Sequence, residues 1–347
     1  GSISTAYRAP NIIQVNEKIV VRTGTRNDYS FYRLQQANGI STSSSTLDSR
    51  YSMQRQASGA ENLKSEESDN TSVGFVFTPV DGLVITADYW TIEKENTIGL
   101  FGRNNHTVND MMLRWANGTN NCGTFVGNPA VVREDPDSGD IEDGYFAAAG
   151  VCPFGVIKYV ADEYLNLATR TIEGYDIGVY YDVDTDVGDF GIRYIGSFID
   201  KFEQIPGGEF SEMAAQQASG AIPADIPIDG FGDLLGMNGN YDEKHRLRLS
   251  WSKGPWGATL TGLRKGSFYQ SSLTLSDGTR FVIPSMTVMD LTVDYRFNLK
   301  NSAARIRFAV KNLADERAPT ADRYYGFFAD AHQDLGRNFY VDFRISL

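Results

Sequence analysis

The sequence contains only three histidines that could serve as a general base. One of them, His332, lies between two aspartates in the segment Asp330-Ala331-His332-Gln333-Asp334, the arrangement best suited to hydrolysis. His245 falls on the same face of its predicted strand as the apolar residues Leu247 and Leu249, and this position favours a residue at the membrane interface over a general base. The third is His106, and no motif around any of them sets up a nucleophile. We therefore predict no catalytic residue and no enzyme, with a hydrolase as the alternative.

A run of carboxylates between positions 133 and 143 could bind a cation through hard oxygen ligands. Its spacing does not match an EF-hand, and the turn-forming Pro136 and Gly139 favour a solvated hairpin instead. We expect the hairpin and keep calcium as a weak alternative, with the candidate ligands Asp135, Asp137, Asp140, Glu142 and Asp143. No other metal site and no cofactor is predicted.

Two groups of aromatic residues stand beside arginines in segments without strand periodicity. Rings next to guanidinium groups suit planar or sugar-like ligands, through stacking and hydrogen bonding. The same rings could instead pack the segments against each other, and the sequence leaves both roles open. The candidate ligand contacts are Tyr324, Tyr325, Phe327 and Phe328 in one group and Tyr29 and Tyr32 in the other.

The overall charge and hydropathy limit the class of protein. The 347 residues include 32 basic and 44 acidic side chains, for a net charge of -12, which makes a nucleic-acid partner a poor prediction. No stretch approaches 18 apolar residues, so a transmembrane helix is excluded. A membrane β-strand stays possible, since it shows apolar side chains only at every second position.

Strict alternation of apolar and polar residues is the dominant pattern, and it is clearest from Arg337 to the end of the chain. Period-2 alternation indicates β-strands, because successive side chains point to opposite faces. We predict ten strands, at residues 3–8, 71–79, 83–92, 171–182, 190–201, 245–252, 256–265, 287–297, 304–310 and 337–347. Helical periodicity fits only 109–116 and 210–218, both inside connections.

The connections between these strands alternate in length. Short turns at 79–82, 184–188, 252–255 and 298–302 alternate with long segments at 11–70, 93–170, 202–243, 266–285 and 314–336. This arrangement is typical of an outer-membrane β-barrel, with short periplasmic turns and long external loops, whereas a soluble β-sandwich, the alternative, has no reason for it. Aromatic residues near the short turns fit a membrane interface: Phe75, Phe77, Tyr181, Phe190, Trp251, Trp256, Tyr295, Phe297 and Phe343. We predict an all-β, antiparallel transmembrane barrel.

The polar face of the strands, opposite the lipid, is predicted to carry more basic than acidic residues. The basic set is Arg193, Lys201, Lys244, Arg246, Arg248, Arg296, Arg305, Arg307, Lys311 and Arg344, against Asp88, Asp176, Asp290, Asp294 and Asp342. A basic wall would favour an anionic ligand or an acidic plug surface. In the alternative, these charges pair with each other and with water. Our ligand candidates on this wall are Arg246, Arg248, Arg305 and Arg307.

Several segments, in order along the chain, resemble the TonB-dependent outer-membrane receptors. STAYRAPNI (4–12) is similar to the family's GFRAPNL strand, and ENLKSEES (61–68) to its NPDLKPETS segment. ADYWTIE (87–93), TIEGYD (171–176) and KNLADE (311–316) resemble a later hairpin, a T-GVD strand and an NLFDK segment. The C-terminus resembles the family's closing strand.

The resemblance implies a fragment of a larger protein. Family members form a 22-stranded barrel filled by an N-terminal plug, which a TonB-binding segment precedes. Residues 1–347 would then be the last ten strands, without the plug and the first strands. The implied function is uptake of a scarce nutrient (a metal–siderophore, vitamin or oligosaccharide) across the outer membrane of a Gram-negative bacterium. The implied partners are that ligand, the chain's own plug, a TonB-type energy-transducing protein, and outer-membrane lipid and lipopolysaccharide. A passive porin or a ten-stranded outer-membrane hydrolase is the alternative.

Cys122 and Cys152 are the only cysteines, and both fall in the long 93–170 connection. In a protein exported through the periplasm, two cysteines of one external loop are expected to form a disulfide. Closing such a loop stabilises it by roughly 3–4 kcal/mol in the chain-entropy model. A zinc site is a poor alternative because no histidine accompanies the two thiolates.

Overall fold

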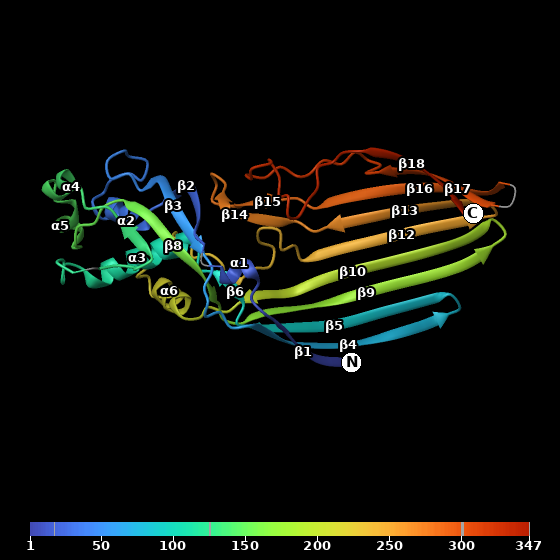
Figure 1. The fold of residues 1–347 in the computed structure, drawn as a ribbon, viewed down its shortest axis with the longest axis horizontal. Helices are drawn as coiled ribbons and strands as arrows, with labels where there is room; N and C mark the ends of the chain where they lie inside the picture. The colour runs from blue at the N-terminus through green and yellow to red at the C-terminus, as the bar shows by residue number, and fades with distance from the viewer. Residues whose placement is uncertain (17, 125, 300–301, 347) are drawn as a thin grey trace.

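The main element of the computed structural model, which describes residues 1–347 except 17, 125, 300–301 and 347, is one long antiparallel sheet. All ten predicted strands are present, and each pairs with the next one along the chain (Figure 1). They are β1 (Ser2–Arg8), β4 (Glu66–Val80), β5 (Leu83–Glu95), β9 (Arg170–Thr185), β10 (Gly188–Gln204), β12 (Glu243–Lys253), β13 (Trp256–Lys265), β16 (Met286–Leu299), β17 (Ser302–Lys311) and β18 (Asn338–Ser346). The short β11 (Gly232–Asp233) adds to β10.

The sheet is open, with β1 at one edge and β18 at the other. A complete ten-stranded barrel would pair its first and last strands, and the described residues form no such pair. This arrangement contradicts the closed ten-stranded barrel on which the hydrolase alternative depended. It fits a segment of a wider barrel.

The connections are sorted by length between the two ends of the sheet, as predicted. The short turns lie at one end, where Gly82 and Gly254 adopt the positive φ that a tight turn needs (Figure 1). Residues 300–301 of the fourth predicted turn and the last residue of the final predicted strand, Leu347, lie outside the described residues. The helices and the additional strands lie at the other end (Figure 1). None of the described helices is long and apolar enough to cross a membrane.

The strand register separates an apolar face from a polar face. Ile192, Leu249 and Leu260 pair across three strands on the apolar face, and Arg193, Arg248 and Thr261 pair on the polar face. All nine aromatic residues predicted near the short turns lie on the apolar face. An apolar band with an aromatic belt at its end is the surface that lipid requires.

Lys201 is an exception to the predicted polar wall. A β-bulge between Ile199 and Lys201 shifts the register, so that Lys201 pairs with Glu173 on the other face. Its Nζ atom lies 3.6 Å from a Glu173 carboxylate oxygen. The prediction for Lys201 was therefore wrong, because a bulge reverses the alternation beyond it.

The long connections form a folded layer rather than irregular loops. They contribute a second sheet of β2 (Val20–Asn27), β3 (Arg50–Ser58), β8 (Ile157–Asn166), β6 (Ile98–Leu100) and β7 (Val131–Arg133), and a hairpin of β14 (Phe268–Thr274) and β15 (Arg280–Ile283). The helices are α1 (Ile12–Val15), α2 (Tyr29–Ala37), α3 (Arg103–Asn117), α4 (Ser138–Glu142), α5 (Tyr145–Ala149) and α6 (Glu209–Ala218). Helices α3 and α6 contain the two predicted helical segments, whereas the second sheet was not predicted.

Hydrophobic clusters join different connections to each other. The largest one packs Tyr29 of α2, Met111 of α3 and Met213 of α6, which belong to the first three long connections. A separate cluster packs Phe268 and Phe328, which belong to the last two. The end of the sheet opposite the short turns therefore carries two packed bodies, which we call the first loop body (11–65, 93–170 and 202–243) and the second loop body (266–285 and 314–336).

We predict that replacing Met111 by alanine destabilises the first loop body and not the sheet. Met111 is fully buried, and large-to-small changes at such positions cost about 2–5 kcal/mol. Hydrogen exchange should become faster in α2, α3 and α6 and stay unchanged in β9 and β10. The control is Ile141→Ala, since that side chain is exposed. Equal acceleration in the sheet and in the loop body would contradict the prediction.

Candidate functional site

The polar face of the sheet carries two kinds of basic residue. Some are paired: Arg193 lies 2.6 Å from Asp182, and Lys311 lies 2.7 Å from Asp290. Arg305 and Arg307 also face carboxylates, at 3.6 Å from Asp342 and 3.7 Å from Asp294. For these four residues the structure matches the alternative in which wall charges pair with each other.

The predicted ligand candidates on β12 are different. Arg246 and Arg248 are exposed on the polar face and form no ion pair within the described part of the chain. Lys244, their neighbour on the same face, also forms no ion pair with any described residue. Three neighbouring positive charges of β12 are therefore unpaired among the described residues, and an anion can approach them from the polar face. Arg344 of β18 and Lys265 of β13 also form no ion pair there.

The aromatic candidates divide between surface and core. Tyr324 is 95% exposed and Tyr325 is 68% exposed, with their rings in edge contact at 5.0 Å. Phe327 is half-buried beside Tyr325, with 6.3 Å between the ring centroids. These three rings form an accessible group, which we call the Tyr324 group.

The remaining aromatic candidates pack the loops. Phe328 is buried in the cluster of the second loop body, and Tyr29 is buried in that of the first. Tyr32 donates a hydrogen bond from its hydroxyl to Asp225 at 2.6 Å, and that bond raises the pKa of Tyr32 to about 12. The sequence left open whether these rings contact a ligand or pack the loops. The structure shows packing for Tyr29 and Phe328.

His332 has no carboxylate partner among the described residues, despite its two flanking aspartates. Its side chain is buried against Phe268, with the rings stacked at 5.6 Å. Asp334 instead binds Arg317, with oxygen–nitrogen distances of 2.6 and 2.7 Å, and this hydrogen bonding lowers the pKa of Asp334 to about 2. A histidine without an orienting carboxylate or a nucleophile is poorly equipped for hydrolysis.

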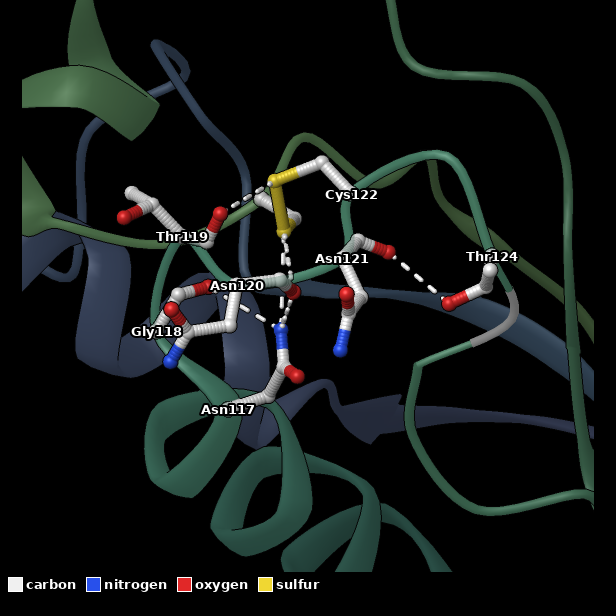
Figure 2. The surroundings of a disulfide bond; sticks show 8 residues. Asn117, Gly118, Thr119, Asn120, Asn121, Cys122 and Thr124 are labelled. Atoms are coloured by element: carbon white, nitrogen blue, oxygen red, sulfur yellow. Dashed lines mark hydrogen bonds between the residues drawn. A yellow bond between two sulfur atoms is a disulfide. The ribbon is translucent and has the colours of Figure 1, made fainter.

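The predicted disulfide between Cys122 and Cys152 is present. It follows α3, and the side chain of Asn117 at the end of that helix points towards it (Figure 2). The Nδ2 atom of Asn117 lies 3.6 Å from Sγ of Cys152 and also donates to the carbonyl oxygens of Gly118 and Asn120. The covalent link thus ties the end of α3 to the segment that leads into β8.

The acidic run folds as a helix instead of the predicted hairpin. Asp137 caps α4 by accepting a hydrogen bond from the backbone N–H of Gly139 at 2.8 Å. Among the residues that the structure describes, no three His, Cys, Asp or Glu side chains gather as a metal site would require. The weak calcium candidates Asp135, Asp137, Asp140, Glu142 and Asp143 therefore belong to an acidic, exposed segment around α4.

A buried charge network at the centre of the first loop body was not predicted. The guanidinium group of Arg133 donates to Asp28 at 2.7 and 2.9 Å and to Asp110 at 2.7 and 3.0 Å. Asp28 also caps α2 and accepts from the hydroxyl of Tyr51 at 2.6 Å. Asp110 receives a further bond from Arg114 at 2.9 Å. The network connects α2, α3, β3 and β7 across two long connections.

The network sets the ionisation of its members. Burial by itself raises the pKa of Asp110, but Arg133 and Arg114 lower it below its ordinary value. Burial lowers the pKa of Arg133, and Asp28 and Asp110 raise it above its ordinary value. Both groups are therefore charged at neutral pH. One feature of the sequence could have pointed to this network: Asp28 directly precedes the helix that begins at Tyr29, and aspartate is a favoured N-cap residue.

We predict that Asp110→Asn destabilises the first loop body by about 3–5 kcal/mol, because it leaves buried arginine charge without compensation. The pKa of Asp110 is lowered in the folded state, so its stabilisation is complete above the unfolded value of about 4 and is lost as pH falls below it. Limited proteolysis of the loops between pH 7 and pH 3 measures both effects. Glu142→Gln, at an exposed residue of α4, is the control. Unchanged proteolysis of Asp110→Asn at pH 7 would refute the prediction.

Comparison with known proteins agrees with this architecture. Residues 1–313 match the family model described as TonB dependent receptor-like, beta-barrel. No curated protein matches the sequence. The siderophore receptor PirA from Acinetobacter baumannii has a similar structure, with a TM-score of 0.51 and 14% identity over 98% of this chain and 37% of its own.

A second similar structure is a mutant of the ferric enterobactin receptor PfeA from Pseudomonas aeruginosa in complex with enterobactin. Its TM-score is 0.52, with 15% identity over 98% of this chain and 37% of its own. At such identities the likeness concerns the fold, and this chain spans little more than a third of either structure. The family match covers most of the sequence, and so the chain belongs to the TonB-dependent receptor family, as part of its β-barrel.

Proposed function

We propose that residues 1–347 are the C-terminal part of an outer-membrane receptor that imports a scarce nutrient with energy from a TonB-type protein. The main support is the open sheet, whose free edges at β1 and β18 suit the missing strands of a larger barrel. The similar receptors are nearly three times as long as the part that this chain matches. The upstream part would supply the first strands and the plug.

The ligand that fits this interior best is an anionic metal chelate. Arg246 and Arg248 present positive charge on the polar face without a carboxylate to neutralise it among the described residues. The accessible Tyr324 group could stack on a planar part of such a ligand. The names of the similar structures, a siderophore receptor and a ferric enterobactin receptor, support a siderophore over a vitamin or an oligosaccharide.

The plug is the second partner that the wall of the barrel would meet. Energy from the TonB-type protein would reach the ligand through this plug. The aromatic belt and the apolar face would contact outer-membrane lipid, and the external strand ends would lie beside lipopolysaccharide. A passive porin is less well supported, because two packed loop bodies occupy the external end of the sheet.

We predict that the double variant Arg246→Glu/Arg248→Glu of the complete receptor weakens chelate binding and uptake by at least about tenfold. The reason is that the loss of one charge-assisted hydrogen bond lowers the affinity by about tenfold. The measurement is uptake of a radiolabelled ferric siderophore by cells, with and without the proton gradient. Arg22→Glu/Arg26→Glu is the matched control, because it makes the same charge change on the exposed edge strand β2.

Two outcomes would contradict parts of this proposal. Normal uptake by the Arg246/Arg248 variant would remove these arginines from ligand or plug contact. Uptake by the wild-type receptor that persists without the gradient would contradict active transport and favour a porin.

A further inference from the structure

A cavity of about 530 Å³ lies on the polar face of the sheet, under the last long loop. Its wall is formed by β13, β16, β17 and β18, and residues 329–336 of the second loop body cover it. Cavities of this size hold small organic molecules. The cavity borders the basic strand β12, because Arg246 pairs with Leu263 and Arg248 pairs with Thr261, although neither arginine lines the cavity itself.

Much of the cavity wall is apolar. Leu263, Met286 and Val288 contribute side chains from the sheet, and Ala331 contributes one from the loop. The ring of Tyr340 adds an aromatic surface from β18. A wall of this kind favours a ligand with an apolar body, because burying that body removes its surface from water.

Lys265 supplies a positive charge that no carboxylate pairs with among the described residues, and Asp330 supplies an unpaired negative charge at the same cavity. Lys311 also lines it but is paired with Asp290, whereas Lys265 forms no ion pair within the described residues. Asp330 is exposed and forms none with Lys265. The ammonium group of Lys265 donates to the carbonyl oxygen of Ala331, and an ammonium group has three N–H donors. Lys265 can therefore hold its place in the fold and still bind an anion.

His332 supplies a second polar group. Its side chain is only 3% exposed, and neither ring nitrogen has a hydrogen-bond partner among the described residues. Stacking on Phe268 fixes the plane of the ring. Burial, together with the charge of Lys265, lowers the pKa of His332, so that the ring is neutral at pH 7 and keeps one N–H donor. A buried polar group without a partner is unfavourable, and a ligand acceptor would satisfy it.

We propose that this cavity is a binding site for a small carboxylate with an apolar body. One carboxylate oxygen accepts from Lys265 and the other from the N–H of His332, while the body of the ligand lies against the wall of Leu263, Met286 and Val288. A carboxylate suits two adjacent donors of which one is charged, and the apolar wall excludes small, fully hydrated anions such as phosphate.

The test uses the complete receptor in detergent without iron, so that its result is independent of the uptake experiment. The probes are benzoate and its neutral counterpart benzamide, followed by saturation-transfer NMR and competition titration. We expect benzoate to bind the wild type at least about tenfold more tightly than benzamide, because only the anion gains from Lys265. Lys265→Met should remove that preference, and His332→Phe, which keeps the stacked ring, should weaken benzoate binding severalfold.

Lys244→Met is the matched control, because Lys244 pairs with Lys265 in register and does not line the cavity. It should retain most of the preference for benzoate. Thermal unfolding followed by circular dichroism verifies that each variant is folded. Equal binding of the two probes to the wild type, or a preference for benzoate that survives Lys265→Met, would overturn the proposal.

Discussion

Every strand of the main sheet must present apolar side chains to lipid on one face and polar side chains to water on the other. At the same time, its backbone N–H and C=O groups must stay hydrogen-bonded to the neighbouring strands. Among the described helices, none has the length and apolar character needed to cross a membrane. The requirement accounts for the period-2 alternation, the apolar rows across neighbouring strands and the aromatic belt near the short turns. It also explains why the polar face can keep charged residues that a packed core would exclude.

The long connections beyond the strand ends are stabilised by hydrophobic clusters and a buried charge network instead of sheet pairing and lipid contact. Residues of the long connections meet water on all sides, so they need cores of their own. The clusters around Met111 and Phe328 provide them, and the Asp28–Arg133–Asp110 network joins the parts of the first loop body. Both bodies lie at the end of the sheet opposite the short turns (Figure 1).

The sequence predicts the structure well wherever a feature depends on a pattern among neighbouring residues. All ten strands follow from alternation, and β4 begins earlier than predicted because residues 66–70 are all polar and show no alternation. The disulfide followed from the export compartment. The bulge before Lys201 leaves no local trace, so the face of that residue was wrongly predicted. The burial of Tyr29 and Phe328, and the network around Arg133, depend on partners far away in the chain, which a local sequence pattern does not reveal.

The parallel pairing of β3 with β8 has a consequence for how the protein is made. Gln54 pairs with Tyr159, so β3 must wait for about a hundred further residues before its partner exists. The hairpins of the main sheet, in contrast, close through turns of a few residues. Non-local pairing is slow because the closing chain loses more entropy. The pairing of β3 with β8, like that of Leu83 in β5 with Tyr181 in β9, is therefore expected to be among the slow steps of folding.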